Sequence, residues 1–140
     1  MRKPLLLLFI SLIVFACTPG AQADAEEEVI PIAETDVRFE FSTTEPNYDE
    51  VEMVYYDHTI DAFRDSTLVF NYDNGGNPLP LILLWENHGF KYLRGEIYRN
   101  NFSPAELNVK IFVNDTEVYN ETEAGTPNQF ARIVWDYTID

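Results

Sequence analysis

The sequence has only one cysteine, Cys17, and few basic residues. A single cysteine cannot form a disulfide within the chain, so the stability of the fold must come from a packed core. Only 9 lysine and arginine residues oppose 24 aspartate and glutamate residues, and the net charge at pH 7 is −15. Because such a surface repels phosphate backbones, we expect no nucleic-acid partner.

Motifs of catalysis are also absent from the sequence. It contains no Gly-x-Ser-x-Gly motif, no glycine-rich phosphate loop and no zinc-ligand spacing. His58 and His88 lie in different predicted connections, and neither has a serine or cysteine nearby in a nucleophile setting. We therefore expect no enzymatic activity, no catalytic residue and no cofactor.

The sequence lacks an apolar run long enough to cross a membrane. Its longest apolar run, residues 5–15, has 11 residues, whereas a spanning helix needs roughly 20. Arg2 and Lys3 precede the run, and small residues follow it. A basic start, a short apolar core and small residues are typical of a secretory signal peptide. We predict that residues 1–16 form this signal.

The apolar run ends in Val14-Phe15-Ala16-Cys17, which resembles the lipobox of bacterial lipoproteins. In that class the cysteine thiol is alkylated by a diacylglyceryl group, and cleavage before the cysteine frees an amine for further acylation. The resemblance implies a bacterial envelope protein anchored in the membrane by lipid on Cys17. Thr18, in place of an aspartate after the cysteine, implies the outer membrane. The alternative is an ordinary signal peptide with an incidental cysteine.

Residues 17–36 have the composition of a tether. They are rich in small and acidic residues and hold too little apolar surface to fold alone. A flexible segment of this length has a mean reach of about 25 Å. The alternative is that residues 29–32 pair as a strand, which Pro31 permits only at a sheet edge.

From Val37 onward, apolar and polar residues alternate with the period of a β-strand. The expected strands are 37–42, 51–57, 66–72, 79–85, 90–99, 107–113, 116–121 and 129–139. Turns are expected at 44–47, 73–76, 86–89 and 114–115, and residues 58–65 are expected to be irregular or to form one helical turn. Residues 79–85 are apolar on both faces, which is typical of a strand covered on both sides or leading into a corner.

This spacing of seven or eight strands predicts an all-β domain over residues 37–140, an immunoglobulin-like antiparallel β-sandwich. A small closed β-barrel is the alternative. Without a cysteine pair, we expect Trp135 and the aliphatic rows to form the core. Gly95 is expected to mark a bulge or a close approach of another chain segment.

The strand pattern resembles the β-domain of the small mycobacterial membrane protein (MmpS) accessory family and its lipoprotein relatives. The resemblance lies in residues 37–42, 51–56, 83–85 and 107–118. Residues 111–115 take the place of the family's Ile-x-Val-Asp-Gly hairpin, and 131–139 that of its closing strand. The chain differs from the family in four features. Leu84 occupies the position of the family's proline, and Thr116 that of the turn glycine. The family's cysteine pair is missing, and a lipobox is present where the family has a membrane-spanning helix. The resemblance implies a non-catalytic accessory domain beside an envelope transporter.

Two groups of side chains have ligand-binding chemistry. Asp57, Asp61 and Asp65 would share one face of a helix, and their oxygens suit Ca²⁺. Their spacing is not that of an EF-hand, and we therefore prefer a polar loop without metal. Six tyrosines could form an aromatic face that stacks on sugar rings, or they could be the core and rim of the sandwich. They are Tyr48, Tyr55, Tyr56, Tyr92, Tyr98 and Tyr119.

Two functions remain open. The first is a lipid-anchored, non-enzymatic interaction domain that binds a membrane or transporter protein of the envelope. The second is a ligand-binding module for carbohydrate or calcium. An exposed apolar sheet edge would favour the first function, and a contiguous exposed aromatic strip would favour the second.

Overall fold

The computed structural model describes residues 31–140, and their side chains from residue 34 onward. The predicted signal at 1–16, the predicted lipid site Cys17 and the tether up to residue 30 lie outside the described residues. The regular elements of the described chain are all β-strands, as predicted.

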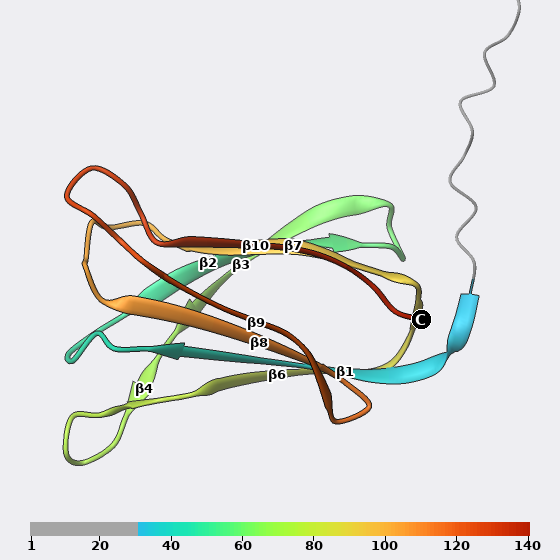
Figure 1. Cartoon of the computed structure of the whole chain (residues 1–140), viewed down its shortest axis with the longest axis horizontal. Coiled ribbons are helices and arrows are strands. Elements are labelled where there is room, and N and C mark those ends of the chain that lie inside the picture. The colour runs from blue at the N-terminus through green and yellow to red at the C-terminus, as the bar shows by residue number, and fades with distance from the viewer. Residues whose placement is uncertain (1–30) are drawn as a thin grey trace, which may run out of the picture.

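The strands form two four-stranded antiparallel sheets that lie face to face (Figure 1). The first sheet has the order β6 (Leu81–Phe90), β1 (Pro31–Thr43), β8 (Glu106–Val113) and β9 (Thr116–Ala124). The second has the order β10 (Arg132–Thr138), β7 (Tyr92–Arg99), β2 (Glu50–Asp57) and β3 (Ala62–Val69). A two-stranded ribbon, β4 (Asn71–Tyr72) and β5 (Pro78–Leu79), connects β3 to β6. The predicted immunoglobulin-like sandwich is confirmed, and two separate sheets exclude the closed barrel.

The core lies between the sheets and is built from alternate residues of each inner face. Trp135 is the largest buried side chain, and its ring centroid lies 5.7 Å from that of Phe39 in the opposite sheet. The closing strand presents Ala131, Ile133 and Trp135 to the core, as the alternation predicted. Gly95 pairs with Trp135 across β7 and β10, and a Cβ at Gly95 would lie 2.6 Å from an indole carbon. The close approach predicted at Gly95 is therefore confirmed.

Two turns form where the sequence predicted them. Asn114 and Asp115 connect β8 to β9 with φ values of 46° and 63°, which Asn and Asp adopt more readily than most residues. The Asp73 carboxylate accepts hydrogen bonds from the backbone N–H groups of Gly75 and Asn77, and Gly76 has a φ of 79°. This second turn closes the β4–β5 ribbon.

Three local predictions were wrong. Residues 58–61 form a short hairpin turn rather than a helical turn, and β3 already begins at Ala62. Residues 86–89 do not turn the chain but belong to β6, where Asn87 has a φ of 55° and the register with β1 shifts. Of the two alternatives for residues 79–85, coverage on both sides is wrong, because Ile82 and Leu84 are exposed on the outer face of β6.

Strand β1 begins at Pro31, within the segment predicted to be a tether. Pro31 pairs with Phe90 of β6, whereas pairing with β8 begins only at Val37. The first residues of β1 therefore have a partner strand on one side only, which is the position in a sheet that a proline tolerates.

Candidate functional site

The two long sides of the sandwich differ. At one side β9 and β10 approach each other, and the Tyr119 hydroxyl donates a hydrogen bond to the Val134 carbonyl at 3.0 Å. At the other side β6 and β3 are the outermost strands of their sheets, and no strand of the described chain pairs with their outer edges. Each outer edge therefore presents backbone N–H and C=O groups that another chain could pair with.

The β6 edge has the longer uninterrupted apolar run. Five apolar residues in a row begin the strand, with Leu81, Leu83 and Trp85 packed against the core. Ile82 and Leu84 point to the outside and are 64% and 49% exposed. An extended edge strand with exposed aliphatic side chains favours pairing with another strand.

The β3 edge has a mixed character. Phe63 and Val69 are 65% and 44% exposed, but the strand also exposes Arg64, Asp65 and Thr67, whose hydroxyl donates to the Glu52 carboxylate. Charged and polar side chains on an edge oppose strand addition. The sequence did not distinguish these two edges, because neither strand was predicted to be at the edge of a sheet.

A second feature is a pocket between the two sheets, at the end of the sandwich where β1 begins. Its volume is about 240 Å³. The lining comes from β2, from the β2–β3 turn and from β6, and we name it the aromatic–histidine pocket. The lining residues are Tyr55, Tyr56, Asp57, His58, Thr59, Trp85, His88 and Phe90.

The structure brings together the two histidines that the sequence placed in separate connections. The His58 ring stacks on Phe90 with centroids 4.9 Å apart, and the His88 ring meets Phe90 edge-on at 5.5 Å. His88 also stacks on Trp85 at 5.7 Å. No local sequence signal joins these residues, since the contact arises from the packing of β6 over β2.

The two histidines differ in their hydrogen bonds. His58 Nε2 lies 3.0 Å from the Tyr92 carbonyl oxygen, which can only accept, so this nitrogen carries the proton. His88 Nε2 is buried and has no hydrogen-bond partner among the described residues. Burial lowers the pKa of His88 and the neighbouring His58 lowers it further, against a smaller opposite effect of the Tyr92 carbonyl. His88 is therefore neutral at pH 7.

Among the residues described, Asp57 supplies the only carboxylate of the pocket lining. The Thr59 hydroxyl and backbone N–H both donate to Asp57 Oδ1, at 2.5 and 2.9 Å, and Arg64 Nε lies 2.7 Å from Oδ2. The Thr59 hydrogen bond is the main reason that the pKa of Asp57 is lowered. Desolvation raises this pKa, and Arg64 lowers it further. The described lining therefore combines an ionised carboxylate with aromatic rings and the neutral His88.

The three calcium candidates do not come together. Asp57 is engaged by Thr59 and Arg64, Asp61 accepts a hydrogen bond from the Tyr56 hydroxyl, and Asp65 lies within β3 opposite Val54. The helix that would have aligned them is a β-hairpin. Within residues 31–140, no three His, Cys, Asp or Glu side chains are grouped to hold a metal ion.

The six candidate tyrosines do not form one face. Tyr55 and Tyr119 pack against the core from opposite sheets, and Tyr56 points to the other face of β2 from Tyr55. Tyr48 is exposed in the β1–β2 loop, where its hydroxyl donates to Glu50. Tyr92 and Tyr98 both lie on the outer face of β7, opposite the inward-facing Leu93 and Ile97. Only Tyr55 and Tyr56 line the aromatic–histidine pocket.

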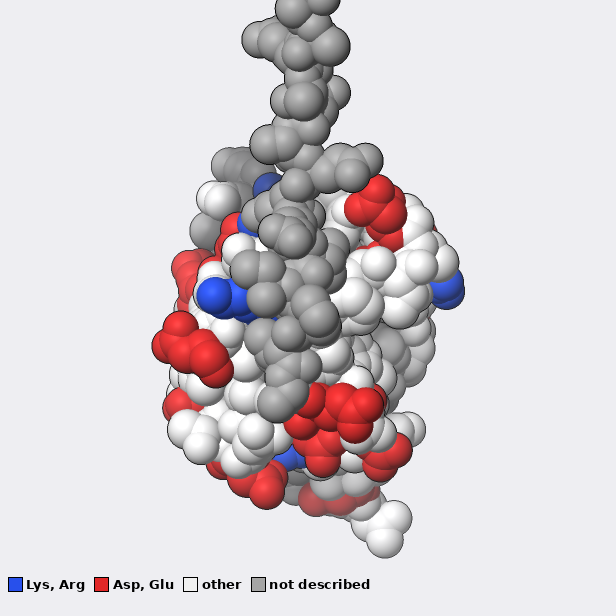
Figure 2. Space-filling model, turned by 90° about the vertical axis from the view of Figure 1, so that its right-hand side faces the viewer, with Lys and Arg blue, Asp and Glu red and all other residues white. Residues whose placement is uncertain are grey.

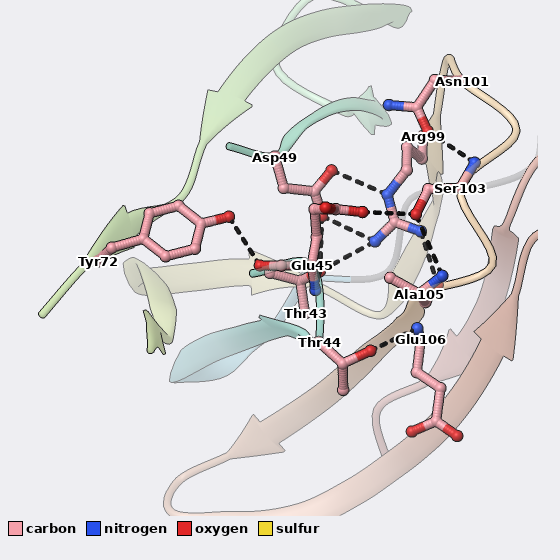
Figure 3. Close-up of polar contacts among 10 residues, drawn as sticks. All are labelled: Thr43, Thr44, Glu45, Asp49, Tyr72, Arg99, Asn101, Ser103, Ala105 and Glu106. Atoms are coloured by element: carbon pink, nitrogen blue, oxygen red, sulfur yellow. Dashed lines mark hydrogen bonds and ion pairs between the residues drawn. The ribbon is translucent and has the colours of Figure 1, made fainter. Parts of the chain in front are cut away.

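The opposite end of the sandwich contains a fully buried ion pair (Figure 3). Arg99 Nε and Nη2 donate to the two carboxylate oxygens of Asp49 at 2.8 and 2.7 Å. Nη2 also donates to the Thr43 hydroxyl, and Nη1 donates to the Ala105 carbonyl. Because every side-chain group is paired and both charges are 0% exposed, this cluster joins the loops of the sandwich and offers no surface to a ligand.

Charge is spread unevenly at the pocket end. Figure 2 looks onto this end and shows acidic side chains in several groups, with fewer basic ones between them. Asp36 connects β6 to the β8–β9 turn there, since its carboxylate accepts from the Asn87 backbone N–H at 3.1 Å and its own N–H donates to the Asn114 side chain.

Within residues 31–140, the structure contains no helix that is long and apolar enough to cross a membrane. In comparisons with protein-family models, with curated proteins and with solved structures, nothing matches the chain.

Proposed function

We propose that the chain is a non-catalytic lipoprotein of the bacterial cell envelope, anchored by lipid on Cys17, whose sandwich binds an envelope protein. The observation that carries the proposal is the free edge of β6 with its exposed aliphatic residues Ile82 and Leu84. Such an edge recognises an extended segment of a partner by adding it to the sheet, with main-chain hydrogen bonds for affinity and alternate side chains for specificity.

The anchor would keep the β6 edge close to the membrane. Between Cys17 and Pro31 a fully extended chain reaches at most roughly 50 Å. A membrane protein or a protein attached to the same membrane would lie within that distance. The resemblance to the MmpS accessory family supports a transporter as this partner.

The acidic surface favours a basic partner segment. Opposite charges speed the encounter of two proteins, and the effect weakens as salt rises above about 0.1 M, where the screening length is near 10 Å. Binding is therefore expected to lose affinity with rising salt.

Site-specific crosslinking in native membranes tests the proposal. The full chain would carry a photoreactive amino acid at Ile82 or, as a matched control, at Val134, which is 55% exposed on the other sheet. We expect a discrete crosslinked product from position 82 and none from position 134. The product should disappear in the Leu84→Lys variant and in the Cys17→Ala variant, which lacks the anchor.

Two results would contradict the proposal. Equal products from both positions would mean that the β6 edge has no special role. A product from position 82 that survives Leu84→Lys would mean that the partner is not held along the exposed aliphatic row.

A further inference from the structure

The aromatic–histidine pocket has a lining unlike the rest of the sandwich interior. Tyr55, Trp85 and Phe90 are half-buried and line the pocket. Their mutual contacts hold them in place, with Tyr55 and Trp85 centroids 5.1 Å apart and Trp85 resting on buried Phe39 at 4.7 Å. Rings fixed in this way form a preorganised apolar surface for a flat ligand.

The polar groups of the pocket are few and specific. His88 Nε2 is a buried nitrogen without a partner among the described residues, and an unpaired buried polar atom is costly unless a ligand satisfies it. Asp57 Oδ1 already accepts two hydrogen bonds from Thr59, whereas Oδ2 is in contact with Arg64 and retains acceptor capacity. The Thr59 side chain adds a hydroxyl at the rim. A ligand with hydroxyl groups can both donate to and accept from this set.

Charge and size narrow the ligand class. Asp57 and the net charge of −15 disfavour an anionic ligand. The volume of about 240 Å³ is below the roughly 300–1,000 Å³ of sites for drug-sized ligands, so the pocket accommodates a single ring rather than a long chain.

We infer that the aromatic–histidine pocket binds one neutral sugar ring. The rings of Tyr55 and Trp85 contact the apolar face of the sugar, while His88 Nε2 and the Asp57 carboxylate form hydrogen bonds to its hydroxyl groups. This site is separate from the exposed aliphatic row of β6, and a glycan bound here leaves Ile82 and Leu84 free.

The two tryptophans make a direct test possible. Trp85 lines the pocket, whereas Trp135 is buried in the core and serves as an internal control. The indole N–H signals of both would be followed by NMR in the full chain during titration with the methyl glycosides of glucose, galactose, mannose and N-acetylglucosamine. We expect the Trp85 signal to shift saturably with at least one of these sugars at millimolar concentration, while Trp135 stays unchanged.

Variants assign the effect to the pocket. His88→Phe keeps a ring but removes the nitrogen, and the affinity should fall at least about tenfold, which corresponds to roughly 1.4 kcal/mol. Leu84→Ala, on the outer face of the same strand, should leave the affinity unchanged. An unchanged Trp135 signal in each variant verifies that the core is intact.

Three outcomes would overturn the inference. One is the absence of a saturable Trp85 shift with all four sugars. A second is a sugar affinity that His88→Phe does not alter. The third is a Trp85 shift with choline and none with the sugars, which would identify a site for organic cations held by ring faces and Asp57.

Discussion

Arg99 is a charged residue whose surroundings leave it no contact with water. Its guanidinium makes four hydrogen bonds, to both oxygens of Asp49, to the Thr43 hydroxyl and to the Ala105 carbonyl. Two buried charges stabilise a fold only when the pairing is complete, because each has lost its hydration. The arginine therefore fixes the relative position of the ends of β1 and β7 and the start of β2.

Arg99→Met should lower the free energy of unfolding by about 3–5 kcal/mol, because it leaves the Asp49 carboxylate buried without a counter-charge. Urea denaturation measures the loss. The double variant Arg99→Met, Asp49→Leu should recover part of it. Arg132→Met is the control, since Arg132 is 59% exposed and its ion pair with Glu96 is expected to contribute about 0–1 kcal/mol. A single Arg99→Met variant as stable as the parent would show that the buried pair is dispensable.

His88 makes the stability of the domain depend on pH. Burial lowers its pKa below 6.5, so the unfolded chain binds a proton at a higher pH than the folded chain does. Stability due to this residue is therefore retained above pH 6.5 and is lost as the pH falls through the folded pKa. From pH 7.5 to 5, the free energy of unfolding should decrease less steeply in His88→Phe than in the parent. The difference in slope should stay below about 1.4 kcal/mol per pH unit, the value for one full proton. Parallel slopes in the two proteins would contradict the assignment.

Among the structural elements, those set by local backbone geometry were predictable from the sequence, whereas those set by the packing of strands were not. The turn at Asn114 and Asp115 was predictable, because both residues tolerate the left-handed backbone conformation that the turn requires. The edge position of β6 was not predictable, since side-chain periodicity indicates which faces of a strand are buried and not which strands it pairs with.

The candidate site was harder to predict than the fold. His58 and His88 are 30 positions apart, and only the packing of the β2–β3 turn against the end of β6 places both beside Phe90. The buried Arg99–Asp49 pair also lacks a local signal in the sequence. Arginine and aspartate are usually exposed, and the residues near each of them do not indicate its partner. The lining of a pocket between two sheets is set by strand order, which periodicity alone does not determine.

The packing of Trp135 of β10 over β7 depends on Gly95. A methyl group there would lie 2.6 Å from an indole carbon of Trp135 and 2.6 Å from the Val54 carbonyl oxygen, which is backbone and cannot move aside easily. Gly95→Ala should therefore destabilise the domain by about 1–3 kcal/mol. Gly89→Ala in β6 is the matched control, because no atom lies within 4 Å of the added carbon, and its effect should stay within about 0.5 kcal/mol. Thermal unfolding of both variants separates the two cases, and equal midpoints would refute the close-packing argument.

The whole molecule is asymmetric along its long axis. β1 begins at the end that carries the aromatic–histidine pocket, and the buried Arg99 cluster lies at the other end (Figure 1). An anchor at Cys17 would therefore bring the pocket end towards the membrane. The acidic side chains on that end (Figure 2) would be repelled by anionic headgroups, so the domain is expected to stand off from the lipid surface rather than lie on it.

The lipid anchor itself is the last prediction. A mature chain that starts at Cys17 should carry a diacylglyceryl thioether, because two acyl chains hold a protein on a membrane durably whereas one does so only marginally. Mass spectrometry of the N-terminal peptide from membranes measures both the start residue and the added mass. Cys17→Ser should abolish the modification while the circular dichroism of the sandwich stays that of a β-protein, since residues 31–140 form the fold without Cys17. A mature N-terminus at another residue, or an unmodified Cys17, would identify an ordinary secretory signal instead. The β6 edge would then no longer be held at a membrane, and its partner would have to be sought among soluble proteins.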